Sequence, residues 1–159
     1  MDESALLRVE LPRGMYNAKL DDRGRIKLPA DFQTYIGSLR ERKLFITSLD
    51  RRIAQIYPMA IWREKEQSLA AYRDDPRLSR ILAFNANDLG GETEMDTQGR
   101  VVFPPDLRRE LNIEEQPVKI YAYKGRIEVL STRIYEDRKN EAVQLTAEDL
   151  TKAEAAGLN

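Results

Sequence analysis

One short sequence pattern occurs twice in this chain at a fixed spacing. The stretch LDDRGRIKLPADF covers Leu20–Phe32, and the stretch MDTQGRVVFPPDL covers Met95–Leu107. The two stretches align with an offset of 75 residues (96 − 21), and at that offset the residues Asp, Gly, Arg, Pro and Asp are identical. An internal repeat of this kind predicts a fold built from two copies of one structural unit.

Each copy of the pattern predicts a strand, a tight turn, a second strand and a helix. Asp favours the first position of a turn, and Gly supplies the left-handed conformation near its end, which predicts turns over 21–24 and 96–99. Arg25 and Lys27 alternate with apolar residues, so the strand after the first turn has one basic and one apolar face. Pro29 then suits the first turn of a helix.

The complete unit has the order strand, turn, strand, helix, strand, strand. In the first copy we expect elements over residues 15–20, 25–28, 29–36, 43–49 and 51–57. In the second copy we expect them over 91–95, 100–103, 104–111, 118–123 and 126–130. Further helices are predicted over 59–72, 77–86 and 132–144. For 145–159 we expect either a short solvated helix with Thr146 as its N-cap or disorder. Because a four-stranded unit cannot close its own core, we expect the two copies to pack face to face about a pseudo-twofold axis.

The composition excludes several kinds of chemistry. The 159-residue chain contains no cysteine and no histidine, which excludes disulfides, thiol chemistry, histidine catalysis and most zinc sites. The sequence also lacks a phosphate-binding loop and a dinucleotide fingerprint, so we expect neither an enzyme nor a cofactor. No apolar run approaches the ~20 residues of a membrane span, and the N-terminus lacks a signal-peptide core. We therefore expect a cytoplasmic protein.

Charge is distributed unequally between the two copies. The net charge of −1 argues against nucleic-acid binding by the whole chain, so such binding must rest on a local patch. The window Lys19–Leu28 has four basic residues against two acids, whereas Glu94–Phe103 has one basic residue against two acids. We expect the face with Arg25 and Lys27 to carry Lys19 from the partner strand as well. A β-ribbon with a basic face can contact phosphates and enter the major groove of DNA.

The repeated motif and its surroundings resemble the MraZ family, whose members consist of two AbrB-like (SpoVT/AbrB) swapped-hairpin units. The resemblance covers residues 12–136, and its most specific element is Asp-x-x-Gly-Arg in two copies with Tyr-Pro-x-x-x-Trp between them. Gln33 stands where the family usually has Arg. The stretches that carry the resemblance are Arg13-Gly14, DDRGRIKLP (21–29), YPMAIWREKEQSL (57–69) and MDTQGRVVFP (95–104).

This resemblance implies an α+β protein, mainly β with helices, made of tandem duplicated swapped-hairpin β-barrel units with pseudo-twofold symmetry. It implies a transcriptional regulator, commonly a repressor, that binds double-stranded DNA at repeated sites. Those sites lie upstream of the division and cell-wall gene cluster that begins with its own gene. It also implies a ring-shaped homo-oligomer associated with the nucleoid, with no membrane partner and no small-molecule substrate. The expected division is an extension (1–12), a first repeat (13–57), a helical connector (58–91), a second repeat (92–136) and a tail (137–159).

The predicted DNA-contacting residues come mainly from the first copy. We expect base or phosphate contacts from Arg23, Arg25 and Lys27, because arginine's planar fork suits guanine edges and phosphates. Lys19 and Arg13 are expected to contact the DNA backbone. The other predicted members of the site are Arg100, a weaker candidate for DNA contact, and the motif scaffold of Asp21, Gly24, Asp96 and Gly99.

Other interpretations are open. Asp21 and Asp96 could each cap turn amides and pair with the nearby arginine, which would explain the motif without DNA. A solvated hairpin face would explain the remaining basic residues. The chain could also be a structural or protein-binding oligomer without sequence-specific DNA affinity, or an antitoxin-like AbrB relative. Trp62 and Tyr57 are expected in the core or a subunit interface rather than stacked on bases.

Overall fold

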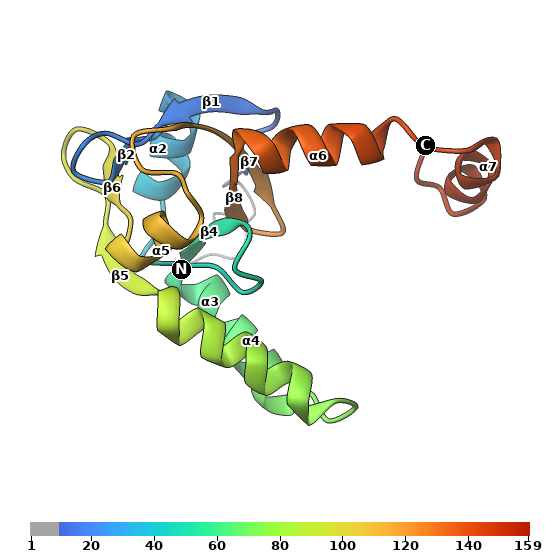
Figure 1. The fold of residues 1–159 in the computed structure, drawn as a ribbon, viewed down its shortest axis with the longest axis horizontal. Coiled ribbons are helices and arrows are strands. Elements are labelled where there is room, and N and C mark those ends of the chain that lie inside the picture. Colours follow the sequence, from blue (N-terminus) through green and yellow to red (C-terminus); the bar gives the residue numbers. More distant parts are fainter. Residues whose placement is uncertain (1–9) are drawn as a thin grey trace.

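The computed structural model describes residues 10–159 of the chain. It shows an antiparallel six-stranded sheet, a separate two-stranded ribbon and several helices (Figure 1). This arrangement confirms the predicted α+β class. A helical hairpin and the C-terminal helices extend from the sheet in different directions (Figure 1).

The predicted order of elements is present in both copies. The first copy contains β1 (Tyr16–Lys19), β2 (Arg25–Lys27), α2 (Ala30–Gly37), β3 (Lys43–Thr47) and β4 (Ala54–Pro58). The second copy contains β5 (Gly91–Glu94), β6 (Arg100–Val102), α5 (Pro105–Glu110), β7 (Pro117–Tyr123) and β8 (Arg126–Ser131).

The two copies exchange strands rather than pack face to face as separate units. β1 pairs with β7, β5 pairs with β3, and β2 pairs with β6, so each of these pairs joins one copy to the other. Within the first copy, β1 and β2 are joined by one isolated bridge, Leu20–Ile26. The sheet order β1-β7-β8-β4-β3-β5 becomes its own reverse when the copies are exchanged, as pseudo-twofold symmetry requires. The prediction of β-barrel units is wrong, because the strands of residues 10–159 form an open sheet and a ribbon.

The pseudo-twofold axis passes through two buried strand pairs. Ile26 lies opposite Val101 in the ribbon, and Ala54 lies opposite Val129 in the sheet. The partners in each pair are 75 residues apart (101 − 26 and 129 − 54), so each residue meets its own equivalent. All four belong to one continuous core cluster. Burying a large aliphatic side chain stabilises a fold by about 1.5–3 kcal/mol, so this core fastens the ribbon to the sheet.

The predicted connector helices form a projecting hairpin. They are α3 (Met59–Ala71) and α4 (Pro76–Leu89). At the base of the hairpin, the ring centroid of Trp62 lies 4.6 Å from that of Phe45 and 4.9 Å from that of Tyr57. Tyr57 and Trp62 are both buried, which confirms that they belong to the core.

The C-terminal segment is helical. It forms α6 (Thr132–Ala142) and α7 (Ala147–Ala155). The Thr146 hydroxyl accepts a hydrogen bond from the Asp149 N–H, and the Asp149 carboxylate accepts one from the Thr146 N–H. At the other end, Gly157 adopts a left-handed φ of 73° and the Leu158 N–H donates to the Ala153 carbonyl. Of the two alternatives for 145–159, the capped helix is therefore correct, with Thr146 as the predicted N-cap.

Candidate nucleic-acid interface

The first repeated turn is built around the Asp21 carboxylate. Its Oδ1 accepts hydrogen bonds from the backbone N–H groups of Arg23 (2.9 Å) and Arg25 (2.8 Å). Its Oδ2 accepts a hydrogen bond from Nε of the Arg25 side chain at 2.8 Å. Gly24 closes the turn in the left-handed region with φ 75°, and its N–H donates to the Asp21 carbonyl. One carboxylate thus shapes the turn and orients the first arginine of the following strand.

The second turn repeats this arrangement. Asp96 Oδ1 accepts from the backbone N–H groups of Gln98 and Arg100, both at 2.9 Å. Asp96 Oδ2 accepts from Nε of Arg100 at 2.9 Å, and Gly99 has φ 78°. These are the contacts that the turn-capping interpretation predicts, and they account for the spacing of the motif in both copies.

The hydrogen bonds of the turns keep both carboxyl groups ionised. The Arg25 N–H lowers the pKa of Asp21 against the opposing effect of burial, and the Arg25 guanidinium and the Arg23 N–H lower it further. The Arg100 N–H likewise lowers the pKa of Asp96. Each turn is therefore held by a charged acceptor throughout the neutral pH range.

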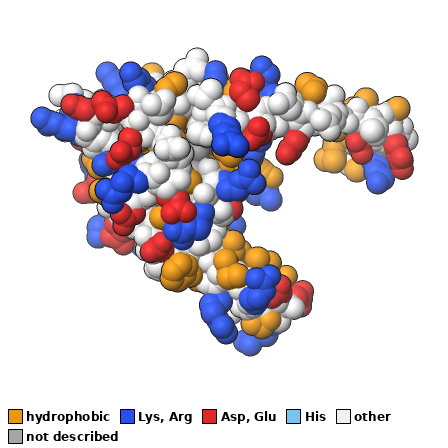
Figure 2. All heavy atoms as spheres, in the orientation of Figure 1, with side chains coloured by type: hydrophobic (Ala, Val, Ile, Leu, Met, Phe, Trp, Pro, Cys, Tyr) orange, Lys and Arg blue, Asp and Glu red, His pale blue; other side chains and the backbone are white. Residues whose placement is uncertain are grey.

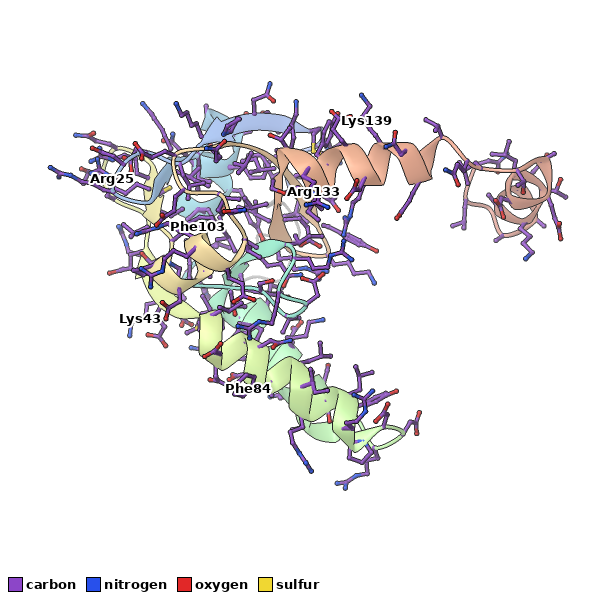
Figure 3. The ribbon with its side chains drawn as sticks, viewed as in Figure 1. Arg25, Lys43, Phe84, Phe103, Arg133 and Lys139 are labelled. Atoms are coloured by element: carbon purple, nitrogen blue, oxygen red, sulfur yellow. The ribbon has the colours of Figure 1, made fainter. Side chains whose placement is uncertain are left out.

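The β2/β6 ribbon brings basic side chains from both copies onto one face. Arg25 lies opposite Val102, and Lys27 lies opposite Arg100. The residues between them, Ile26 and Val101, point into the core. The outward side chains are therefore three basic residues and one valine, without an acid among them. Figure 3 shows Arg25 at the edge of the molecule, on the side away from α6.

The predicted position of Lys19 needs correction. The sequence suggested that Lys19 lies on the strand that pairs with β2, but β1 pairs with β7, where Lys19 is opposite Pro117. The partner of β2 is β6, which supplies Arg100 instead. Strand exchange is the cause, because the tight turn sends β1 and β2 to different partners.

The remaining predicted residues lie along the first copy. Arg23 is exposed at the turn, between β1 and β2. Arg13 precedes β1 and forms an exposed ion pair with Glu10 at 3.3 Å. Arg13 is six residues before Lys19 in the chain, and Gly14, with φ 106°, bends the backbone between Arg13 and β1. Some of the predicted residues thus lie on the ribbon or its first turn, whereas Lys19 and Arg13 lie on β1 or before it.

Arg108 covers the first turn and was not anticipated from the sequence. Its Nη1 donates to the Phe103 carbonyl (2.8 Å) and to the Arg23 carbonyl (3.4 Å). A Cβ added to Gly24 would lie 1.7 Å from this Nη1. The 75-residue offset makes Gln33 the equivalent of Arg108 (108 − 33), and Gln33 covers Gly99 in the same way. The helix of each copy therefore shields the turn glycine of the other.

Other kinds of site find little support in the described residues. Within 10–159 there is no group of three or more Asp and Glu side chains that could hold a metal ion. No helix in that part of the chain is long and apolar enough to cross a membrane. The ribbon and its two turns are therefore the strongest candidate for a functional site.

Known proteins resemble this chain over most of its length. A protein of Acidobacterium capsulatum named "Transcriptional regulator MraZ" is 34% identical over 137 residues, which cover 86% of this chain and 92% of the relative. This chain belongs to the MraZ family. The "Transcriptional regulator MraZ" of Koribacter versatilis is 36% identical over 141 residues, with the same coverage of both chains. The protein of that name from Herpetosiphon aurantiacus is 34% identical over 109 residues, which cover 66% of this chain and 71% of the relative.

The family match extends beyond the second ribbon strand. Residues 90–157 match a family model described as "MraZ protein, putative antitoxin-like". This range runs from β5 through α7, so the C-terminal helices belong to the sequence that the MraZ family shares. The resemblance inferred from the repeated motif is confirmed.

Proposed function

We propose that this MraZ family member is a transcriptional regulator that binds double-stranded DNA through the β2/β6 ribbon and its turns. The observation that carries the proposal is the pairing of β2 with β6. This pairing places Arg25, Lys27 and Arg100 on one outward face. Each of the two arginines also pairs with the aspartate of its own turn. A two-stranded ribbon fits the major groove, and the names of the relatives supply independent support.

Turn capping and DNA contact are compatible roles for Arg25. Its Nε is held by Asp21, and neither Nη atom forms a hydrogen bond with another residue of 10–159. The Asp21 contact therefore fixes the guanidinium while leaving its outer edge available to a guanine or a phosphate. Fixing a side chain before binding reduces the entropy lost in the complex. Asp21 and Asp96 act as scaffold in this proposal.

Other basic residues add contacts with phosphates. The side chains of Arg23 and Lys27 form no ion pair with any residue in the described part of the chain. We place Lys19 and Arg13 against the DNA backbone, and Arg100 as a secondary contact from β6. A small number of phosphate contacts per chain gives weak DNA binding that depends strongly on salt.

Assembly of several chains compensates for the small number of DNA contacts per chain. We propose a ring-shaped homo-oligomer that engages repeated sites upstream of the division and cell-wall cluster, where it represses its own operon in the nucleoid. Linking several binding modules raises apparent affinity on the order of 10²–10⁴. In this organisation 13–57 and 92–136 are the repeats, 58–91 is the connector, 1–12 is an extension and 137–159 follows the second repeat.

The salt dependence of DNA binding in single variants tests the ribbon directly. We expect Lys27→Ala and Arg23→Ala each to reduce the slope of log K against log salt by about 0.9, because each removes one phosphate contact. Lys139→Ala is the matched control, since it removes the same charge from α6 on the far side of the molecule from Arg25 (Figure 3). Equal slopes for all three variants would remove the ribbon from the interface and favour a structural or protein-binding oligomer.

A further inference from the structure

We propose that copies of this chain join head to tail, with the C-terminal arm of one copy docking on α4 of the next. The C-terminal arm is residues 143–158, which include α7. The α4 face consists of Leu78, Ile81 and Phe84 with Arg77 and Arg80 beside them. This inference rests on the oligomeric assembly proposed above and names the surfaces that form it.

The α4 face is an apolar stripe that the rest of residues 10–159 leaves exposed. Leu78, Ile81 and Phe84 recur every three residues, so their side chains lie along one side of the helix. Phe84 is 63% exposed, and the other two are also exposed. Figure 2 shows hydrophobic atoms gathered along α4, with basic and acidic side chains near the tip of the hairpin. A contiguous apolar patch on a projecting element indicates a protein interface.

The C-terminal arm carries a second apolar surface that no other described segment of the chain covers. Val143, Leu145, Leu150 and Leu158 are all more than half exposed, and neither α6 nor α7 contains a buried residue. α7 has nine residues, and isolated helices shorter than ~12–15 residues are marginal in water. Its two caps define its ends but bury no apolar area. A partner that covers the leucines would supply the packing that α7 lacks.

The two surfaces have opposite charge. Between Pro76 and Phe84, α4 carries Arg77 and Arg80 and no acid, and the Asp75 carboxylate before them is held by the Leu78 N–H as the helix cap. Between Ala147 and Ala155, α7 carries three acids against one basic residue. Opposite potentials across an interface orient the partners and disfavour the pairing of two like surfaces. This argues against α4 docking on α4 and for α7 docking on α4.

The position of the two surfaces explains why the contact joins different copies. In Figure 1 the arm and the hairpin leave the sheet in different directions, and α7 lies at the far end of α6 from the sheet. Two unlike surfaces on one chain form a heterologous contact, which generates a ring when its rotation closes. The ribbon lies on the side of the sheet away from both surfaces (Figure 1), so every copy in such a ring keeps its ribbon uncovered.

Complementation between two variants tests the contact. The face variant carries Ile81→Asp and Phe84→Asp, and the arm variant carries Leu150→Asp and Leu158→Asp. We expect each variant alone to be monomeric by light scattering after size exclusion, at a concentration where the wild-type chain is oligomeric. An equimolar mixture should form dimers and nothing larger, because the intact arm of the face variant meets the intact α4 of the arm variant. Met15→Asp, at another exposed apolar residue, should leave the oligomer intact.

Several results would overturn the proposal. Full-sized oligomers of the arm variant would show that the arm is not required, and an arm variant that assembles while the face variant does not would indicate α4 docking on α4. The four substituted side chains are exposed, so we expect both variants to fold, and circular dichroism checks this. A monomeric wild-type chain would refute both this contact and the ring.

DNA binding separates this inference from the proposed function. Both variants keep the ribbon, so we expect their affinity for a duplex with one site to equal that of the wild-type chain. Their affinity for a duplex with repeated sites should fall on the order of 10²–10⁴-fold, because avidity is lost. The wild-type oligomer could also lack affinity for DNA while both variants disassemble as expected. That result would support this inference and reject the proposed function.

Discussion

The substitution Gly24→Ala should destabilise the fold because the turn of one copy is covered by the helix of the other. Gly24 has φ 75°, and a residue with a Cβ costs about 1–2 kcal/mol in that conformation. The new Cβ would lie 1.7 Å from Nη1 of Arg108, so the guanidinium must move. It then loses the 2.8 Å hydrogen bond to the Phe103 carbonyl, which is worth about 1.5–3 kcal/mol for a charged donor. We expect the free energy of unfolding to fall by about 2–4 kcal/mol, since Arg108 recovers part of its hydration.

Urea unfolding followed by the fluorescence of Trp62, the one tryptophan of the chain, measures this change. Protein concentration must be fixed, because association adds to apparent stability. Gly37→Ala is the control: it has no heavy atom within 4 Å of the added Cβ, so its effect should stay within about 0.5 kcal/mol. In Gly24→Ala/Arg108→Ala the clash is absent, so the double variant should lose less stability than the sum of the single variants.

A Gly24→Ala protein within about 0.5 kcal/mol of the wild-type chain would refute this reasoning. So would strict additivity in the double variant, because it would mean that Gly24 and Arg108 do not interact. Either result would leave the turn held by its own copy alone.

Three further predictions concern the turns and the core. Asp21→Asn should weaken DNA binding despite the loss of a negative charge, since it frees the Arg25 side chain. Asp22→Asn should strengthen binding. Anisotropy titrations in which both variants bind DNA more tightly would contradict the scaffold role of Asp21. DNA affinity and stability should not change between pH 6 and 8, because the chain has no histidine and the pKa values of Asp21 and Asp96 lie below the usual 3.8. The stability that these carboxyls contribute is complete above their unfolded pKa and is lost as pH falls through the lowered folded pKa, so urea midpoints that drop between pH 7 and 6 would be inconsistent with it. Ile26→Ala should lower the free energy of unfolding by about 2–5 kcal/mol, whereas Val102→Ala, at an exposed position, should lower it by under about 0.5 kcal/mol. Similar urea midpoints for the two variants would argue against a core on the pseudo-twofold axis.

Local sequence chemistry predicted the elements of both copies well. The Asp and Gly positions defined the turns, the alternation around Ile26 defined the buried face of β2, and the prolines marked the helix starts. Each of these features depends on residues that are close together in the chain. The 75-residue offset also predicted the pseudo-twofold symmetry, because equal sequences form equal structures.

The pairing of strands could not be predicted from local chemistry or from the offset, and only the resemblance to a family of swapped-hairpin units implied an exchange. An offset shows which residues are equivalent, but it does not show whether β1 pairs within its own copy or with the other. Lys19 was therefore assigned to the wrong neighbour. The role of Arg108 has the same origin, since its equivalence to Gln33 was available but its place over Gly24 requires strand exchange.

Long-range ion pairs could not be predicted from the sequence either. Arg51 adopts a left-handed φ of 61° and donates to Glu110 and Asp88, each at 2.8 Å. These acids lie 59 and 37 residues away, on α5 and α4. No local pattern links such distant charges, and only the folded chain brings them together.

Fluorescence anisotropy with DNA from upstream of the protein's own gene tests the central claim most directly. The comparison uses a shuffled duplex of equal length and composition at about 150 mM salt, where non-specific phosphate contacts are weakened. We predict tighter binding to the native duplex by at least about tenfold, and loss of that preference in Arg25→Ala. Equal binding to both duplexes by the wild-type chain would contradict the account, and would leave the duplicated motif as a device for folding and assembly.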